Sequence, residues 1–388
     1  MLSTNLLSPD DLTALIALRH ALHQHPEISG EECETAKVVS RELTAMGCNT
    51  QITQLGGHGV AAIFESPKSG PTVMIRCELD ALPIADLSGL PYASTRRGQG
   101  HLCGHDGHMV IALGLAKILT QHPPERGRVV ILFQPAEETG AGARAVLSDP
   151  RFAEIMPEYA YALHNYPGRP LGQVALVEGP ANCASRGVKV TLTGKSSHAS
   201  DPQDGISPAP AIARLITDLP QLSQGQIDGD DFRLVTVTHV DMGTASYGIA
   251  PGEATLLATL RSVSDSEMVD LVQAAETVVK TAAKVGNLKV KIDYEDIFSG
   301  CVNGPAEIAR LKTACGKVGI PTDTLSYPMR WSEDFGEFHR AGAQSAMFFL
   351  GSGENHPQLH NPDYDFPDRL ISPAIHVFFE VLKGHWQE

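Results

Sequence analysis

A continuous apolar strand followed at once by two acids sets the fold class, because residues 128–138 read RVVILFQPAEE. Arg128–Phe133 lacks the alternation of a half-exposed strand, and such runs are typical of strands buried on both faces of a parallel sheet. The stretch before it, Met109–Leu119, has the length and apolar character of a helix. Glu137 and Glu138 come directly after the strand, which is where open α/β sheets bind their ligands.

Helices and strands alternate on both sides of this segment. Ser8 followed by Pro9 and two acids predicts a helix start, and a second helix is expected from about Glu31 to Met46, ended by Gly47. We therefore predict an α/β fold, with a mainly parallel mixed sheet and helices on both of its faces. The other elements of this part are expected at Val60–Phe64, Thr72–Cys77, Tyr159–His164 and Ala346–Leu350 (strands), and at Ala306–Cys315 and Ser372–Leu382 (helices).

The pattern changes near residue 184, where strands with a period of two replace the continuous apolar runs. Two amphipathic helices lie among these strands, and the whole stretch is close to the usual size of one domain. We predict an inserted α+β domain at residues 184–296 within a catalytic domain formed by residues 1–183 and 297–388. Its strands are expected at Val188–Thr193, Leu234–Val240, Ala254–Val263 and Lys289–Tyr294, and its helices at Pro208–Leu222 and Ser266–Lys284.

Composition excludes several classes of protein. The 388 residues include 30 basic and 45 acidic side chains, a net charge of −15, which speaks against nucleic acid or an anionic membrane as the partner. No apolar run approaches the roughly 20 residues of a membrane-spanning helix. Met1–Leu7 lacks the basic region and apolar core of a signal peptide. Seven cysteines are too few for a disulfide scaffold, so we expect a cytoplasmic protein.

Polar side chains that suit metal binding gather near the predicted strand ends. They offer one thiolate, one carboxylate and three imidazoles, a mixture that borderline-soft divalent cations prefer. Taken singly each is weak evidence, since an isolated Cys is usually a buried apolar residue and a Glu-Glu pair is commonly an exposed helix start. A structural zinc site is disfavoured because Cys₄ or Cys₂His₂ spacing is absent. The candidate ligands are Cys103, His105, Glu138, His164 and His360.

Several motifs occur in an order that resembles a known family. They are residues 19–32, Arg76–Pro83, Cys103–His108 (CGHDGH), Gln134–Glu138 (QPAEE), Leu163-His164, Gly194–Pro202 and His360–Asp368. Together they resemble the dinuclear metallopeptidases of the aminoacylase type, in the branch of hippurate hydrolases and indoleacetyl-amino acid (auxin-conjugate) amidohydrolases. The resemblance spans nearly the whole chain. It implies a zinc-peptidase-like catalytic domain with an inserted lid or dimerisation domain.

The resemblance also implies a role for each candidate residue. Cys103 would bridge two divalent ions, zinc or manganese in the first place and otherwise cobalt or nickel. His105 and His164 would complete the ligands of one ion, and Glu138 and His360 those of the other.

Three further residues take part in the implied catalysis. Glu137 would be the general base and acid, and Asp80 would orient a ligand imidazole. His198, in the inserted domain, matches a histidine that stabilises the tetrahedral intermediate, often from the neighbouring subunit of a homodimer.

The implied reaction cleaves the amide bond of an N-acyl-amino acid, giving a carboxylic acid and an amino acid. Two divalent ions with two anionic ligands leave about two positive charges, enough to activate a water for which Glu137 is the base. Two alternatives stay open: a dipeptidase or carboxypeptidase with the same site, and a non-catalytic metal-dependent binding protein. The adjacent Glu137 and Glu138 argue against the binding protein, which would need only the ligand carboxylate.

The sequence departs from the family pattern at positions that bear on substrate identity. Glu78 stands where the family usually has Asp, and Gly248 replaces an Asn that helps to bind substrate. Arg330 and Trp331 precede the family's Ser-Glu-Asp-Phe segment, and Arg330 either lines the substrate pocket or simply covers a packed Trp. Arg261 matches a family arginine, and carboxylate recognition and a structural ion pair are equally good interpretations of it.

Overall fold

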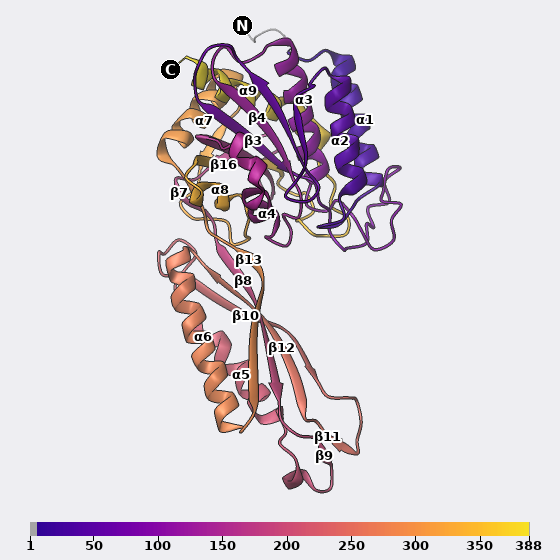
Figure 1. Cartoon of the computed structure of the whole chain (residues 1–388), viewed down its shortest axis with the longest axis vertical. Helices are drawn as coiled ribbons and strands as arrows, with labels where there is room; N and C mark the ends of the chain where they lie inside the picture. Colours follow the sequence, from indigo (N-terminus) through magenta and orange to yellow (C-terminus); the bar gives the residue numbers. More distant parts are fainter. Residues whose placement is uncertain (1–5, 388) are drawn as a thin grey trace. The chain divides into compact units, whose positions relative to one another are not determined.

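The computed structural model describes residues 6–387, and the protein divides into two compact units (Figure 1). Unit 1 comprises the described residues up to Ala181, Val302–Ser326 and the residues from Asp334 onward. Unit 2 comprises Asn182–Cys301 and Tyr327–Glu333, a short segment that the sequence analysis places in the second part of the catalytic domain. Residues 1–5 of the stretch considered as a signal peptide lie outside the described residues.

A mixed eight-stranded sheet forms the centre of unit 1, in the order β1-β2-β4-β3-β5-β16-β6-β15. Its four central strands, β4-β3-β5-β16, are parallel, as are β6 and β15, whereas β1 and β2 pair in antiparallel fashion with their neighbours and β6 is antiparallel to β16. This confirms the mainly parallel mixed sheet. The strands are β1 Gln51–Leu55, β2 Gly59–Glu65, β3 Thr72–Glu78, β4 Arg128–Gln134, β5 Tyr159–Pro167, β6 Val174–Leu176, β15 Thr322–Thr324 and β16 Gln344–Gly353.

Helices cover this sheet, and its central strands are buried accordingly. Every residue of β3 is buried, because Val73, Ile75 and Cys77 join the core formed with α1, α2, α3, α7 and α9 while Met74 points to the opposite face. The helices are α1 Pro9–Gln24, α2 Cys33–Ala45, α3 His105–Gln121, α4 Gly142–Ser148, α7 Pro305–Val318, α8 Gly336–Arg340 and α9 Ile371–Trp386, with short 3₁₀ turns η1 Pro150–Glu154 and η4 Asp368–Leu370.

Helix α3 begins four residues earlier than the apolar pattern predicts. Its first turn holds His105, Asp106 and His108, and apolar residues start only at Met109, so the apolar pattern misses that turn. Gly104 precedes the helix with φ 91°, in the left-handed region. An ideal Cβ at Gly104 would lie 2.5 Å from Oδ1 of Asn165, so both the backbone conformation and the space require glycine there.

Unit 2 is a four-stranded antiparallel sheet with two helices packed against it, in the order β10-β12-β8-β13. Val188, Val190 and Leu192 of β8 point into the core with α5 and α6, as the period of two predicts. The elements are β8 Ala184–Thr193, β9 Ser197–His198, η2 Pro202–Asp204, α5 Ala209–Asp218, η3 Leu219–Leu222, β10 Arg233–Met242, β11 Ile249–Ala250, β12 Glu253–Ser262, α6 Asp265–Val285 and β13 Lys289–Phe298. A separate two-stranded sheet pairs β7 Gly179–Asn182 with β14 Cys301–Asn303.

None of the helices within residues 6–387 combines the length and the apolar character needed to cross a bilayer.

Candidate active site and metal centre

The candidate ligands of unit 1 come from loops and strand ends that the parallel sheet brings together. Glu137 and Glu138 follow β4, and Asp80 follows the neighbouring strand β3, with which β4 is paired in parallel. His164 is part of β5, on the other side of β3. Cys103 and His105 lie at the start of α3, and His360 lies in a turn after β16.

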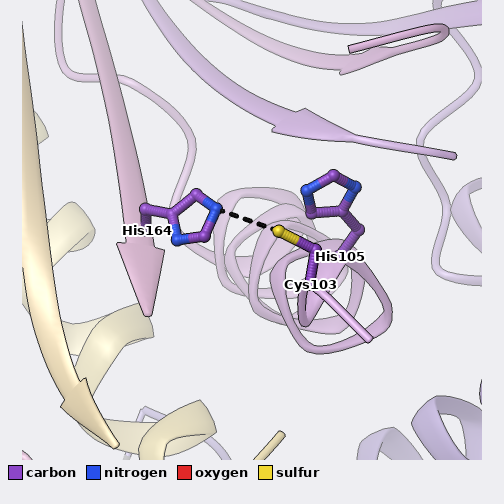
Figure 2. Close-up of side chains that lie close together, drawn as sticks. All are labelled: Cys103, His105 and His164. Carbon is purple, nitrogen blue, oxygen red and sulfur yellow. Dashed lines mark hydrogen bonds between the residues drawn. The ribbon is translucent and has the colours of Figure 1, made fainter. Parts of the chain in front are cut away.

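Cys103, His105 and His164 form one group of metal-binding side chains, shown in Figure 2. The imidazole of His164 points toward Cys103, with Nε2 3.5 Å from Sγ. Nδ1 of His164 donates to the carbonyl oxygen of Asn165, and Nδ1 of His105 donates to that of Asp80, each over 2.9 Å. These hydrogen bonds leave the Nε2 lone pairs of both rings available to a cation.

Cys103 also belongs to a second group, with Glu138 and His360. Nε2 of His360 lies 3.6 Å from Oε2 of Glu138, and Oε1 of Glu138 lies 3.9 Å from Nε2 of His105. The two groups share one sulfur atom. If each group held a cation, the thiolate of Cys103 would be available to both.

Glu137 lies beside these positions, with Oε2 3.9 Å from Nε2 of His105. The turn that carries it has Ala136 at φ 50°, in the left-handed region. The buried carboxylate of Glu32 accepts a hydrogen bond from the Ala136 N–H over 2.7 Å and thereby holds this turn. Glu137 and Glu138 are thus two consecutive carboxylates that both lie close to His105. Of the two, Glu138 belongs to the group with Cys103 and His360, and Glu137 does not.

Asp80 is fully buried and contacts both groups. Its Oδ2 accepts hydrogen bonds from the backbone N–H of Glu138 (2.9 Å) and from the hydroxyl of Ser29 (2.7 Å). Its Oδ1 lies 3.6 Å from Nδ1 of His105, whose ring is oriented by the Asp80 carbonyl. Asp80 therefore holds the backbone of Glu138 in place on one side and the imidazole of His105 on the other.

Burial and neighbouring charges shift the pKa values of four candidate ligands. Burial, reinforced by Glu138 and Glu137, raises the pKa of the Cys103 thiol, so that a cation is needed to favour the thiolate. Burial lowers the pKa of His164, and burial together with the charge of His105 lowers that of His360 to about 4, so both are neutral ligands at pH 7. For His105 burial opposes protonation, but the hydrogen bond to Asp80 and the charges of Glu78 and Glu138 outweigh it and raise the pKa to about 10.

The residues present fit two divalent cations. Nε2 of His105 is buried and makes no hydrogen bond with any described residue, although four carboxylates, those of Glu78, Asp80, Glu137 and Glu138, surround its ring. Such a buried nitrogen is costly unless it carries a proton, as the raised pKa of His105 indicates for the metal-free protein, or binds a cation in its place. A divalent ion in that place would satisfy the nitrogen and the carboxylates together.

Glu78 and His108 form a buried polar pair beneath the ligands. Nδ1 of His108 lies 2.6 Å from Oε2 of Glu78, and Nε2 lies 2.5 Å from Oδ1 of Asn165. The Asn165 amide donates in turn to the hydroxyl of Tyr364 over 2.5 Å. Both nitrogens of His108 are therefore engaged, although Glu78, His105 and His108 also lie close enough to be counted as a metal-binding group. Glu78 additionally pairs with Arg76.

Asn165 and the contacts of His108 are absent from the predictions made from sequence. The signal for Asn165 is its position directly after a ligand histidine, and the signal for His108 is its spacing of three from His105 on one helix.

The remaining predicted site residues belong to unit 2. His198 is exposed, pairs with Ile249 in the β9–β11 ladder, and has Nδ1 2.6 Å from the hydroxyl of Ser200. Arg261 donates to the carbonyl oxygen of Arg330 (2.9 Å) and to the hydroxyl of Ser332 (3.0 Å).

The structural ion pair considered for Arg261 is not found. Among the described residues no carboxylate lies within ion-pair distance of Arg261 or of the exposed Arg330, and burial lowers the pKa of Arg261. At Gly248 an ideal Cβ would meet no atom within 4 Å. The structure therefore has room at this position for the first atom of the asparagine side chain that the family usually has.

A family model described as Peptidase family M20/M25/M40 matches residues 74–384. The chain belongs to this family. This protein is therefore a hydrolase of amide bonds that binds two divalent metal ions, which confirms the prediction from sequence.

Individual relatives agree with the predicted branch. An N-acetyl-L-cysteine deacetylase of Bacillus subtilis (strain 168) is 30% identical, over 95% of this chain and 87% of that protein. An IAA-amino acid hydrolase of Arabidopsis thaliana is 30% identical (91% and 81% covered), and a hippurate hydrolase of Campylobacter jejuni is 28% identical (94% and 94%). The crystal structure of a dinuclear metal-binding peptidase of the M20 family from Bacillus subtilis has a TM-score of 0.80 and 26% identity, covering 97% of this chain and 98% of that one.

Proposed function

We propose that this protein hydrolyses N-acyl-amino acids to a carboxylic acid and a free amino acid. The observation that carries the proposal is the sharing of Cys103 by two groups of ligands, with a second carboxylate, Glu137, beside them. Three relatives, named as a deacetylase of N-acetyl-L-cysteine, a hydrolase of IAA-amino acids and a hydrolase of hippurate, support the same substrate class.

In this proposal each group of ligands holds one ion. Cys103 is the shared ligand, His105 and His164 complete one position, and Glu138 and His360 complete the other. The mixture of thiolate, imidazole and carboxylate donors favours zinc or manganese, with cobalt and nickel as further candidates for the native metal. When bound, the two ions polarise the amide carbonyl and lower the pKa of a nearby water.

Glu137 moves the proton. Its carboxylate accepts a proton from the attacking water as the new carbon–oxygen bond forms, and it donates that proton to the amide nitrogen as the carbon–nitrogen bond breaks. Asp80 holds His105 and the Glu138 backbone in place during both steps. The balance is one water consumed for each amide bond, with no oxidant or reductant.

Arg261 and Arg330 bind the substrate carboxylate. Arg261 donates to the Arg330 carbonyl, which places the two residues together, and neither has a carboxylate partner within the described part of the chain. A guanidinium without an anionic partner is well suited to a carboxylate, which it can bind through two hydrogen bonds.

We further propose that His198 donates to the oxyanion of the tetrahedral intermediate, in a homodimer formed through unit 2. The exposed imidazole, on a short two-stranded ladder, is available to a second copy of the chain. The proposed compartment is the cytoplasm, where reducing conditions keep Cys103 available as a ligand.

The test is a hydrolysis screen of the metal-stripped chain reloaded separately with zinc, manganese, cobalt and nickel. The substrates are hippurate, N-acetylcysteine, indoleacetyl-amino acids and a set of dipeptides, and the control is Glu137→Gln loaded in the same way. Release of amino acid from the acylated substrates, absent in the control, supports the proposal. Hydrolysis of the dipeptides alone would instead identify a dipeptidase, and binding without hydrolysis in every metal form would identify a binding protein.

A further inference from the structure

We propose that Arg19 positions the loop of His360 against the start of α3 and thereby sets the affinity of the Cys103–Glu138–His360 position for its ion. This inference rests on the metal assignment above and goes beyond it, because Arg19 contacts none of the proposed ligands. It concerns unit 1 alone.

Arg19 is a fully buried side chain of α1 with three carboxylates around its guanidinium. Nη1 lies 3.1 Å from Oδ2 of Asp106 and 2.6 Å from Oδ1 of Asp365, and Nε lies 2.8 Å from Oδ1 of Asp368. Burial would lower the pKa of Arg19, but the three carboxylates outweigh it and raise the pKa above its usual value. Arg19 is therefore charged and holds three anions together.

Those three carboxylates belong to the two segments that carry metal ligands. Asp106 follows His105 directly, in the first turn of α3. Asp365 follows His360 in the loop that leads into η4, and Asp368 is the first residue of η4. Arg19 thus joins a ligand segment in the first third of the sequence to one near its end.

The His360 loop depends on such contacts more than the start of α3 does. Residues 360–367 contain no helix or strand, and His360 itself has φ 66°, an uncommon conformation for a residue with a side chain. Its backbone N–H donates to the carbonyl oxygen of Leu102, just before Cys103 (2.8 Å). The α3 segment is instead anchored by its buried helix and by the hydrogen bond between His105 and Asp80.

Neighbouring groups make the contact specific for arginine. The Arg19 guanidinium lies over the ring of Tyr92, 4.8 Å from its centroid, and the Tyr92 hydroxyl donates to Oδ2 of Asp365 over 2.9 Å. A planar guanidinium can reach several carboxylates and stack on an aromatic ring at once, whereas an ammonium cannot. Without the guanidinium, Asp365 and Asp368 would lose a buried cationic partner, whereas Asp106 would keep His23, and the His360 loop, which has no regular secondary structure, would shift relative to α3.

The experiment titrates metal-free protein with zinc and follows binding by calorimetry, with ion content measured by elemental analysis. Arg19→Gln should keep one ion at wild-type affinity and bind the other roughly 10- to 100-fold more weakly, as expected for loss of a group that orients ligands. The affinity of Arg19→Lys for the weakened ion should lie between that of the wild type and that of Arg19→Gln. The isotherm of Arg19→Gln should resemble that of His360→Ala and differ from that of His164→Ala, and Arg41→Gln, an exposed arginine, is the control.

Unchanged binding of both ions in Arg19→Gln would overturn the inference, and so would an equal loss of both ions, which indicates a general structural role. If Arg19→Gln does not fold, Tyr92→Phe removes only the hydrogen bond to Asp365 and should weaken the same ion roughly 2- to 10-fold. No change in Tyr92→Phe would then contradict the proposal.

The outcomes also separate this inference from the proposed function. Absence of hydrolysis with two ions bound contradicts the function and leaves the Arg19 result intact. A wild-type chain that binds fewer than two ions overturns both.

Discussion

The backbone N–H of Glu138 donates to Oδ2 of Asp80 over 2.9 Å, and this hydrogen bond joins the loops that follow two adjacent parallel strands. The Asp80 carbonyl meanwhile accepts from Nδ1 of His105. One buried residue therefore sets the relative position of a carboxylate and an imidazole that we assign to different ions. Because each ion position depends on the same loop, we expect the two sites to respond together to changes at β3.

Replacing Cys103 with alanine should disturb both ion positions. Cys103 is the one residue present in both groups of ligands that contain His164 or His360. The variant should bind fewer than two ions per chain by elemental analysis, and its hydrolysis should fall with the ion content. Cys315→Ala, which removes a buried cysteine of α7, is the control and should keep both ions. Full activity in a metal-free wild-type preparation would refute the metal-dependent reaction.

Gly107→Ala should destabilise unit 1 even though alanine is the better helix former. An ideal Cβ at Gly107 would lie 2.3 Å from the ring of Phe366, which is fully buried, so this ring and its packed surroundings would have to shift. Overpacking of this kind costs about 1–3 kcal/mol of unfolding free energy. Gly316→Ala in α7 is the matched control: its Cβ would meet no atom within 4 Å, so it should stabilise by up to about 1 kcal/mol. Urea denaturation of both variants measures the change in unfolding free energy, which should be a decrease for Gly107→Ala and an increase for Gly316→Ala.

The sequence predicts the central strands and the ligand set for the same physical reason. Strands such as β4 are apolar throughout because both of their faces are covered, and the carboxyl ends of parallel strands meet at one edge. Donors directly after β3 and β4 can therefore be expected to converge on the strength of the strand pattern alone. The geometry of Asp80 and Glu138 bears this out.

Other features leave no local pattern in the sequence. The first turn of α3 consists of polar residues and glycine, so hydrophobic periodicity places the helix start too late, at Met109. Arg19 and His23 lie four residues apart on α1, which hints at a shared buried face, but their partner Asp106 is more than 80 positions away. Contacts over such distances depend on tertiary packing, which spacing alone does not encode.

Shortening Glu78 to aspartate should lower stability, although the family usually has Asp at this position. In this chain the Glu78 carboxylate is fully buried and reaches both Arg76 and His108. A side chain one methylene shorter cannot keep both contacts, and a buried group left without its partner costs about 1–3 kcal/mol. The same substitution at the exposed Glu34, paired with Lys37, should change stability by less than about 0.5 kcal/mol. Equal effects at the two positions would contradict the structural role of Glu78.

His198→Ala should reduce turnover by roughly 10²-fold or more, the range for loss of one oxyanion donor. Ion content should stay at the wild-type level, because His198 belongs to unit 2 and to none of the groups of ligands. His239→Ala, an exposed histidine of β10 in the same unit, serves as the control and should have wild-type kinetics. Wild-type turnover in His198→Ala would leave His198 with no catalytic role.

Glu137→Gln and Glu138→Gln should separate proton transfer from metal binding. Glu138 lies with Cys103 and His360, whereas Glu137 lies near His105 but outside that group. Glu137→Gln keeps the size and hydrogen-bonding shape of the side chain and removes only its basicity. It should therefore retain fold, ion content and near-normal substrate affinity, with turnover reduced by roughly 10²- to 10⁴-fold, the usual contribution of a positioned general base.

Glu138→Gln removes an anionic metal ligand from the group with Cys103 and His360. The variant should therefore lose turnover because it binds fewer ions. Calorimetric metal titration and single-turnover kinetics on both variants give the comparison. Loss of ions in Glu137→Gln with mere slowing in Glu138→Gln would reverse the two roles. Hydrolysis unchanged in both variants would refute the carboxylate mechanism.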